Sequence, residues 1–131
     1  MMILGLGNDI VNIERIQNTR EYLQHFAARI LGPDEQAEIS RNKAAEDIRF
    51  RELLAKYYAA KEAFVKALGT GFRDGIFFKD IQILHNELGK PELKISGMAQ
   101  KYLLKLNPNP RLFVTLSDDM PFAFAVVIIE A

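Results

Sequence analysis

Asp47–Leu68, with the sequence DIRFRELLAKYYAAKEAFVKAL, carries the strongest regular pattern of the chain. Its apolar side chains recur every three or four positions, at Leu53, Tyr57, Ala60, Phe64 and Leu68. This spacing predicts an α-helix whose broad apolar face packs against a core. Gly69 follows at a position where glycine commonly ends a helix. We therefore expect one long helix from about Asp47 to Leu68.

The residues before this helix predict one strand and two helical segments. Met2–Leu6 is a short apolar run that suits a buried strand, and we expect Gly5 and Gly7 to end it in a sharp turn. Ile10–Ile30 has apolar residues at loosely helical spacing. A further helix is expected to begin at Pro33, because proline suits the first turn and two acidic residues follow it.

The residues after the long helix predict strands interrupted by one more helix. We expect strands within Ile76–Leu84, Phe113–Leu116 and Phe122–Ile129, and a helix beginning after Ser96. Since Phe122–Ile129 is apolar at both odd and even positions, both faces of that strand should be covered. The chain has no repeat, linker or low-complexity stretch, so residues 1–131 should form a single α+β domain.

The composition excludes several classes of function. The 131 residues include 17 Lys and Arg against 17 Asp and Glu, a net charge of zero, which argues against a general nucleic-acid-binding protein. The absence of cysteine excludes disulfides, thiolate zinc sites and cysteine nucleophiles, and two histidines are too few for a three-histidine metal site. No segment resembles a membrane span or a signal peptide, so we expect a cytoplasmic protein.

Two carboxylates are candidates for a metal site. Asp9 follows Gly5 and Gly7, where its side chain can face a cleft, and Glu62 lies on the long helix. Together they offer hard oxygen ligands, which suit Mg²⁺ better than zinc. The plainer interpretations are a turn or cap role for Asp9 and a surface ion pair between Glu62 and Lys66, four residues later.

Three other motifs are less informative. The N-terminal glycines match the start of a dinucleotide-binding G-x-G-x-x-G motif, but Ile10 replaces its third glycine. Gly69-Thr70-Gly71 follows a helix C-terminus, the negative end of the dipole, so it favours a turn over a phosphate cradle. A basic stripe, most simply explained as solvated helix charges, is formed by Arg15, Arg20 and Arg29. Composition and spacing alone do not identify a reaction.

Four segments together resemble the holo-[acyl-carrier-protein] synthases, the short bacterial type of phosphopantetheinyl transferase. They are GLGNDIVNIERI (5–16), YYAAKEAFVKALGTGF (57–72), DIQIL with GKPEL (80–84 and 89–93), and VTLSDD with FAVVIIE (114–119 and 124–130). Their order and spacing match the family from end to end, as does the chain length. The AAKEAFxKALGTG block is highly specific, so the resemblance covers the whole chain.

The resemblance implies a fold in which a long central helix packs on an antiparallel sheet. It implies an enzyme that moves the 4'-phosphopantetheine arm of coenzyme A to a serine of apo acyl carrier protein and releases adenosine 3',5'-bisphosphate, in support of fatty acid biosynthesis. It also implies Mg²⁺ as cofactor and a homotrimer with each active site between two subunits. Nucleic acid and membranes have no part in this function.

The resemblance assigns residues to the metal and to coenzyme A. Asp9 and Glu62 match the family's Mg²⁺ ligands. Lys61 and Lys66 match lysines near the phosphates of the coenzyme. The loop beside the coenzyme corresponds to Gly69, Thr70 and Gly71.

The resemblance also suggests the carrier-binding surface and the base. Arg15 matches an arginine that faces the acidic helix of the carrier protein, and we assign Arg29 to the same surface. Glu62, a metal-bound water or Lys61 could each accept the serine proton, and Glu62, acting directly or through water, is the favoured base.

Two positions depart from the family pattern. Tyr57 in AKYYAAKE stands where many members carry an arginine near the coenzyme, in A-x-R-F-A-A-K-E. Tyrosine cannot provide the bidentate cation that suits phosphate, so Tyr57→Arg would be expected to tighten coenzyme A binding unless Lys56 or another cation substitutes. Asp118 stands where many members have histidine. Neither position belongs to the metal pair, so we expect an active enzyme.

Two alternatives come from other classes of protein. One is a relative that still binds coenzyme A or the carrier but no longer catalyses transfer. The other is an unrelated Mg²⁺-dependent nucleotide enzyme, which would make the whole-chain resemblance an accident. Retention of Asp9, Lys61, Glu62 and Lys66 argues against the first, because binding alone does not require the full set.

Overall fold

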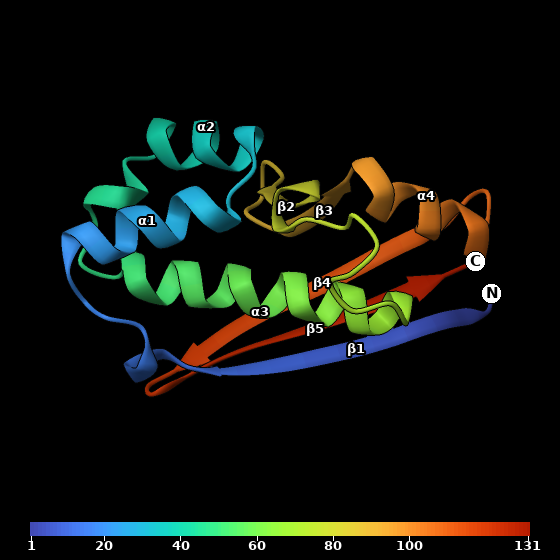
Figure 1. Ribbon diagram of the computed structural model, residues 1–131, viewed down its shortest axis with the longest axis horizontal. Coiled ribbons are helices and arrows are strands. Elements are labelled where there is room, and N and C mark those ends of the chain that lie inside the picture. The colour runs from blue at the N-terminus through green and yellow to red at the C-terminus, as the bar shows by residue number, and fades with distance from the viewer.

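Helix α3 (Phe50–Leu68) runs through the middle of the molecule in the computed structural model, which describes residues 1–131 (Figure 1). It confirms the long helix predicted from the apolar spacing, although it begins three residues after Asp47. Asp47 has extended backbone, and its side chain accepts a hydrogen bond from the amide of Arg49 at 2.8 Å, which keeps this turn outside the helix. Gly69 ends the helix in the left-handed conformation, with φ of 86°, as predicted.

The remaining elements surround α3 on two sides. In chain order they are β1 (Ile3–Asn12), η1 (Ile13–Arg15), α1 (Arg20–Ile30), α2 (Pro33–Arg41), η2 (Ala44–Glu46), η3 (Phe78–Asp80), β2 (Ile81–His85), β3 (Pro91–Ile95), α4 (Gly97–Leu106), β4 (Arg111–Asp119) and β5 (Phe122–Glu130). The mixture of helices and antiparallel strands confirms the predicted α+β class.

A three-stranded antiparallel sheet in the order β1-β5-β4 forms one layer of the fold. Helix α3 covers one face of this sheet, and α1 and α2 lie on the far side of α3 (Figure 1). Strands β2 and β3 form a separate antiparallel pair. The two chain ends lie together, since the amide of Ala131 donates to the carbonyl of Met2 at 2.8 Å. This arrangement is the predicted one, a long central helix packed on an antiparallel sheet.

The N-terminal strand is longer than predicted, and its glycines have a different purpose. Gly5 and Gly7 lie inside the ten-residue strand β1, so the expected sharp turn after Leu6 is wrong. A Cβ atom on Gly5 would lie 2.0 Å from the carbonyl oxygen of Ala67, and one on Gly7 would lie 2.0 Å from that of Ala63. Both distances are far below van der Waals contact. The glycines are therefore required because the backbone of β1 packs directly on α3.

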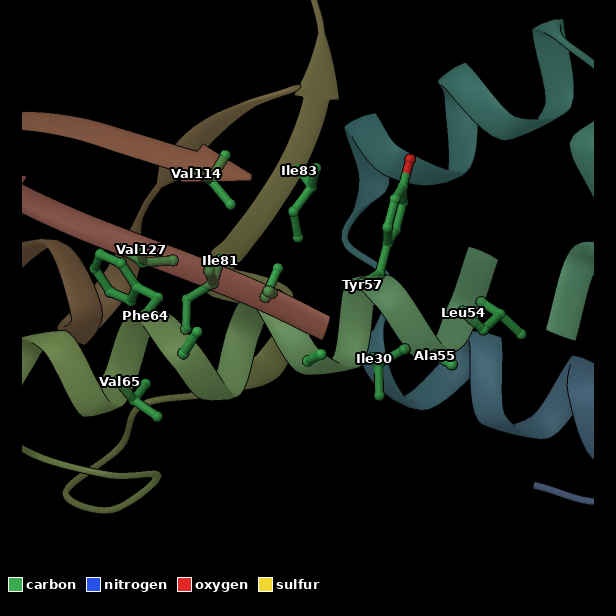
Figure 2. Close-up of a cluster of buried hydrophobic side chains, with 14 of the residues drawn as sticks. Ile30, Leu54, Ala55, Tyr57, Phe64, Val65, Ile81, Ile83, Val114 and Val127 are labelled. Atoms are coloured by element: carbon green, nitrogen blue, oxygen red, sulfur yellow. The ribbon is translucent and has the colours of Figure 1, made fainter. Parts of the chain in front are cut away.

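The core lies between α3 and the sheet and continues under α1 and β2. Its centre includes Phe64 on α3, Val127 on β5 and Ile81 on β2, all fully buried (Figure 2). The inward positions of β5 carry small or branched residues at every second place, from Ala123 to Ile129, which matches the close packing of the helix.

The outer face of the three-stranded sheet is apolar but open in the single chain. It carries Leu6, Ile10, Phe113, Phe122 and Phe124, each between 38% and 66% exposed. We call these five residues the outer sheet face. The prediction that both faces of β5 are covered thus holds within one chain only for the inner face. None of the helices is both long and apolar enough to cross a membrane.

Candidate active site

An open groove lies where β1 and η1 meet the C-terminal half of α3. Its volume is about 520 Å³, and it is lined by Asp9, Ile10, Val11, Asn12, Arg15, Ile16, Tyr58, Glu62 and Lys66. Three of the polar residues named from the sequence, Asp9, Glu62 and Lys66, thus share one surface with Arg15.

The match between strand and helix geometry brings Asp9 to Glu62. A step of two residues on β1, from Gly5 to Gly7, corresponds to a step of four residues on α3, from Ala67 to Ala63. These steps span about 6.6 Å and about 6 Å, so the two elements stay in register. The next step of two residues along β1 reaches Asp9, and the next step of four along α3 reaches Ala59, in the turn that ends at Glu62. Asp9 therefore lies within a regular strand and not in the predicted turn.

The charged groups of the groove interact directly. The ammonium of Lys66 lies 3.0 Å from Oδ1 of Asp9, in an ion pair whose lysine side chain is 52% exposed. Burial raises the pKa of Glu62, and the negative charge of Asp9 raises it further, whereas the Tyr58 hydroxyl and Lys66 lower it. The plainer interpretation was a surface ion pair between Glu62 and Lys66. In the structure, Lys66 instead pairs with Asp9, within a cluster of charges that includes Glu62.

The donor set fits a hard divalent cation. Asp9 and Glu62 are close enough to repel, and a cation between them would relieve that repulsion. No third aspartate, glutamate or histidine joins them, since the chain has no cluster of three such residues. A Mg²⁺ ion held by two carboxylates keeps its other positions for water and phosphate oxygens, which is the usual arrangement for this ion.

Lys61 does not belong to this groove, which corrects the role expected from the resemblance. Its side chain is fully buried, and its ammonium lies 2.7 Å from Oε1 of Glu35. The same ammonium donates to the carbonyl oxygens of Ile30 at 2.7 Å, Ile81 at 2.6 Å and Phe78 at 3.0 Å. Four acceptors already surround its three protons, so Lys61 has none to offer to a phosphate. It also cannot serve as the base.

The partner of Lys61 is fixed by the backbone around it. Oε1 of Glu35 accepts from the amide of Gly32 at 2.8 Å, and Oε2 accepts from the amide of Ile83 at 2.9 Å. Burial raises the pKa of Glu35, while Lys61 and these amides lower it. Since both oxygens accept hydrogen bonds, a proton on the carboxyl would have no acceptor, and the ionised form fits the site. The sequence identified Glu35 only as a favourable acid at a helix start.

Tyr57, at the position where the resemblance led us to expect an arginine near the coenzyme, is buried and does not line the groove. It is 2% exposed and points from α3 toward α2 (Figure 2). Its ring stacks near that of His85, with 6.3 Å between centroids, and burial raises the pKa of its hydroxyl, assisted by Glu38 and Glu35. Tyr57 is a core residue in this chain.

The second departure, Asp118, forms a local charge cluster. Its carboxylate lies 3.0 Å from the ammonium of Lys56 and 3.0 Å from the guanidinium of Arg49. Hydrogen bonds from Lys56, and then from Arg49, lower the pKa of Asp118. The acid therefore neutralises the cation, Lys56, that was considered as a substitute for the missing arginine.

The loop Gly69-Thr70-Gly71 follows α3 as a C-terminal turn. All three of its amides donate to the carbonyl oxygen of Val65, at 3.0 to 3.3 Å. These amides are thus used by the helix end, which agrees with the prediction that the loop is not a phosphate cradle. A Cβ atom on Gly69 or Gly71 would meet nothing within 4 Å, so the loop leaves open space beside it.

Arg15 and Arg29 lie near the same groove from different elements. Arg15 ends η1 and lines the groove itself. Arg29 lies in the last turn of α1; burial and Glu62 raise the pKa of Tyr58, a groove residue, and the charge of Arg29 opposes this rise. Tyr58 also lines the groove, and no pattern in the sequence had identified it as a site residue.

A protein-family model and curated proteins match nearly the whole chain. The family model, described as the 4'-phosphopantetheinyl transferase superfamily, matches residues 5–125. The chain is 45% identical over 132 residues to a holo-[acyl-carrier-protein] synthase of Vibrio parahaemolyticus, covering 100% of both chains. It is 43% identical over 134 residues to that of Erythrobacter litoralis, covering 99% of this chain and 98% of the other.

Solved structures match the fold. The holo-[acyl-carrier-protein] synthase of Neisseria meningitidis superposes with a TM-score of 0.81 and 39% identity, over 99% of this chain and 100% of that one. The holo-(acyl-carrier-protein) synthase of Bacillus anthracis, in complex with CoA (3',5'-ADP), superposes with a TM-score of 0.77 and 32% identity. That match covers 100% of this chain and 99% of the other.

Proposed function

Since this chain belongs to the 4'-phosphopantetheinyl transferase superfamily, as a holo-[acyl-carrier-protein] synthase, we propose that the groove around Asp9 and Glu62 is its active site. The enzyme transfers the 4'-phosphopantetheine arm of coenzyme A to a serine of apo acyl carrier protein, in support of fatty acid biosynthesis. The observation that carries the site proposal is the meeting of Asp9 and Glu62, from a strand and a helix distant in sequence, in one groove.

The chemical step exchanges one phosphorus–oxygen bond for another. The carrier's serine oxygen bonds to the diphosphate phosphorus that bears the pantetheine arm, and the bond from that phosphorus to adenosine 3',5'-bisphosphate breaks. The serine proton passes to Glu62, directly or through water, because a carboxylate that lines the groove can accept it. Lys66, exposed and near the pair, neutralises the negative charge of the leaving group.

Asp9 and Glu62 are the residues that would hold Mg²⁺. When bound, the ion would act as a Lewis acid on the diphosphate and as a template for its orientation. Lys66 forms an ion pair with Asp9 in this structure, and its exposed side chain is free to move to a phosphate oxygen. Gly69, Thr70 and Gly71 border the coenzyme in this proposal, because the open space beside their turn permits close approach.

The carrier protein is proposed to dock beside the groove, against Arg15 and Arg29. Both are cations next to the groove where the serine must arrive, and an acidic carrier surface would complement them. Arg15→Glu is expected to weaken carrier binding roughly fivefold to tenfold at low salt and less at high salt, because salt screens exposed charges. Fluorescence anisotropy of a labelled apo carrier at several salt concentrations measures this.

Lys101→Glu is the matched control for that experiment. It makes the same charge reversal at an exposed position on α4, an element that does not line the groove. It should leave carrier affinity unchanged at every salt concentration. Equal affinities for the Arg15→Glu variant and the unaltered protein would contradict the proposed docking surface.

We also propose a homotrimer with each active site completed between two subunits. The support is the outer sheet face, whose phenylalanine, leucine and isoleucine side chains remain open in the single chain although they lie on one continuous sheet. The groove is likewise open to solvent, which leaves room for a second subunit beside it. Sedimentation equilibrium measures the mass of the assembly.

Intact-mass measurement of an apo carrier after incubation with this protein, coenzyme A and Mg²⁺ tests the proposed function. We expect the carrier to gain one phosphopantetheine arm and expect a chelator to prevent the gain, because two carboxylates alone would repel the diphosphate. Transfer that continues unchanged with chelator would contradict the metal site. Binding of coenzyme A without any transfer to a competent carrier would support the alternative of a non-catalytic relative.

A further inference from the structure

Arg51, in the first turn of α3, joins this helix to the turn that carries Arg15. Its guanidinium donates a hydrogen bond from Nη1 to the carbonyl oxygen of Ile16, at 3.2 Å. Ile16 is the residue at which η1 ends, and it is buried at the lining of the groove. Arg15 immediately precedes it and lines the same groove. Arg51 thus holds the backbone next to a residue that is proposed to dock the carrier.

The turn η1 is held at two points, one on each side of Arg15. Before Arg15, the amide of Ile13 donates to the carbonyl oxygen of Pro121, in the loop between β4 and β5, at 2.7 Å. After Arg15, the carbonyl of Ile16 accepts from Arg51. Figure 1 shows η1 at the end of the molecule where the β4–β5 loop and the beginning of α3 also lie. The sheet therefore holds one end of this turn, and α3 holds the other.

Arg51 lies in one row along α3 with two residues of the groove. It precedes Tyr58 by seven residues and Glu62 by eleven, which correspond to about two and about three helical turns. The hydrogen bond to Ile16 and the carboxylate of Glu62 are thus connected by one continuous helix. Through Arg51, the position of the docking cation Arg15 is tied to the element that carries the proposed metal ligand.

Stability alone does not account for a cation at this position. Arg51 belongs to none of the ion pairs of the chain, and its bond to Ile16 is the only hydrogen bond of its side chain. Its Nε atom is buried and has no hydrogen-bond partner. Since a partly buried charge loses solvation that no acid restores here, an apolar residue would serve the packing as well. What the arginine adds is its contact with the end of η1.

We propose that Arg51 is a positioning residue for Arg15: it holds the end of η1 on α3 and so keeps Arg15 at the edge of the groove, where the acidic surface of the carrier meets it. This inference rests on the proposed function. An exposed arginine on an unrestrained turn samples many orientations, and binding must then restrict them. A turn that is already fixed on both sides reduces this cost. Arg51 therefore acts on carrier affinity through Arg15.

A double-mutant cycle of carrier affinity tests this inference, with fluorescence anisotropy of a labelled apo carrier at low salt as the measurement. Arg15→Ala is expected to weaken binding about threefold to fivefold, as for an exposed charge pair. Arg51→Met should weaken it by a similar factor. Because Arg51 acts through Arg15, the double variant should bind within about twofold of the single variants. A charge effect of Arg51 alone would make the two factors multiply.

Two further measurements separate this role from a general structural one. The KM for coenzyme A should change by less than about twofold in the Arg51→Met variant, since η1 holds the proposed carrier surface. Arg51→Lys should restore most of the carrier affinity, because a long side chain with an ammonium group can also donate to the carbonyl of Ile16. Arg51→Gln, which has a shorter side chain and no charge, replaces Arg51→Met in the cycle if that variant does not fold.

Arg41→Met is the matched control, because it makes the same change at an exposed residue at the end of α2, outside the groove lining. It should leave carrier affinity unchanged. Unchanged affinity in the Arg51→Met variant, or factors that multiply in the double variant, would overturn the role of Arg51 and leave the docking surface intact. Unchanged affinity in the Arg15→Ala variant would overturn the docking surface, and the role of Arg51 with it.

Discussion

Glu62→Gln is expected to lower the rate of phosphopantetheine transfer by about a thousandfold or more. The amide cannot accept the serine proton, and loss of a positioned base alone typically costs 10² to 10⁴ in rate, that is, on the order of a thousandfold. The change also replaces an anionic metal ligand by a neutral one. Quenched time-course assays that follow the mass of the carrier, at Mg²⁺ concentrations varied over a wide range, measure both effects.

The same variant should fold as well as the unaltered protein, or better. The pKa of Glu62 is raised in the folded state by burial and by Asp9, so the folded protein holds this proton more tightly than the unfolded chain does. The ionised carboxylate therefore opposes folding above its unfolded pKa, near neutral pH included, and glutamine removes that penalty. The melting temperature without Mg²⁺ should be equal or higher.

Glu52→Gln makes the same chemical change on the first turn of α3, at a partly buried residue that pairs with Arg49 outside the groove. It should retain activity within about twofold, because Glu52 does not line the groove. Near-normal transfer by Glu62→Gln would remove Glu62 from the mechanism. A fall in activity accompanied by an equal loss of folded protein would instead reveal a structural role.

Lys61→Met is expected to lower the free energy of unfolding by about 3–5 kcal/mol, the typical cost of breaking a buried ion pair from one side. The change leaves the buried carboxylate of Glu35 without its cation, and it removes the hydrogen-bond donor from the carbonyls of Ile30, Phe78 and Ile81. Because domains of this size are stable by only about 5–15 kcal/mol, much of the stability would be lost. Urea denaturation followed by circular dichroism measures it.

The double variant Lys61→Met with Glu35→Gln separates the stranded charge from the lost hydrogen bonds. It should be more stable than Lys61→Met alone, because no net charge is left in the core. The Lys61→Met variant should also keep the KM for coenzyme A per folded molecule, which a phosphate-binding lysine would not allow. An unfolding free energy within about 0.5 kcal/mol of the unaltered protein would contradict the buried-pair argument.

Local patterns in the sequence predicted what local physics controls. The apolar repeat of Asp47–Leu68 and the glycine after it predicted α3 and its end, because both depend on neighbours within a turn or two. The same repeat placed Tyr57 on the apolar face of the helix, and its burial in the core confirms this. Gly5 and Gly7 suggested a turn because the helix that requires them lies about 60 residues later in the chain.

The candidate site depended on contacts that one sequence does not reveal. Asp9 and Glu62 were named from their ligand chemistry and from the resemblance, but only the packing of β1 on α3 brings them together. The sequence did not predict that Lys61 is buried, because its four hydrogen-bond acceptors come from four separate segments of the chain. Three of these acceptors are backbone carbonyls, which carry no sequence signal. Tyr58 was missed because a tyrosine on an apolar helix face looks like any other core residue.

The direct contact between β1 and α3 has a consequence for transplanting this chemistry to another scaffold. The separation of Asp9 from Glu62 is set by two peptide backbones in contact, with no side chain between them at Gly5 or Gly7. If only the two carboxylates were grafted onto a designed strand and helix, they would lie farther apart. Ordinary strand residues have side chains, and these increase the distance between the strand and a helix packed on it. The smallest portable unit is therefore the glycine-bearing strand together with its helix.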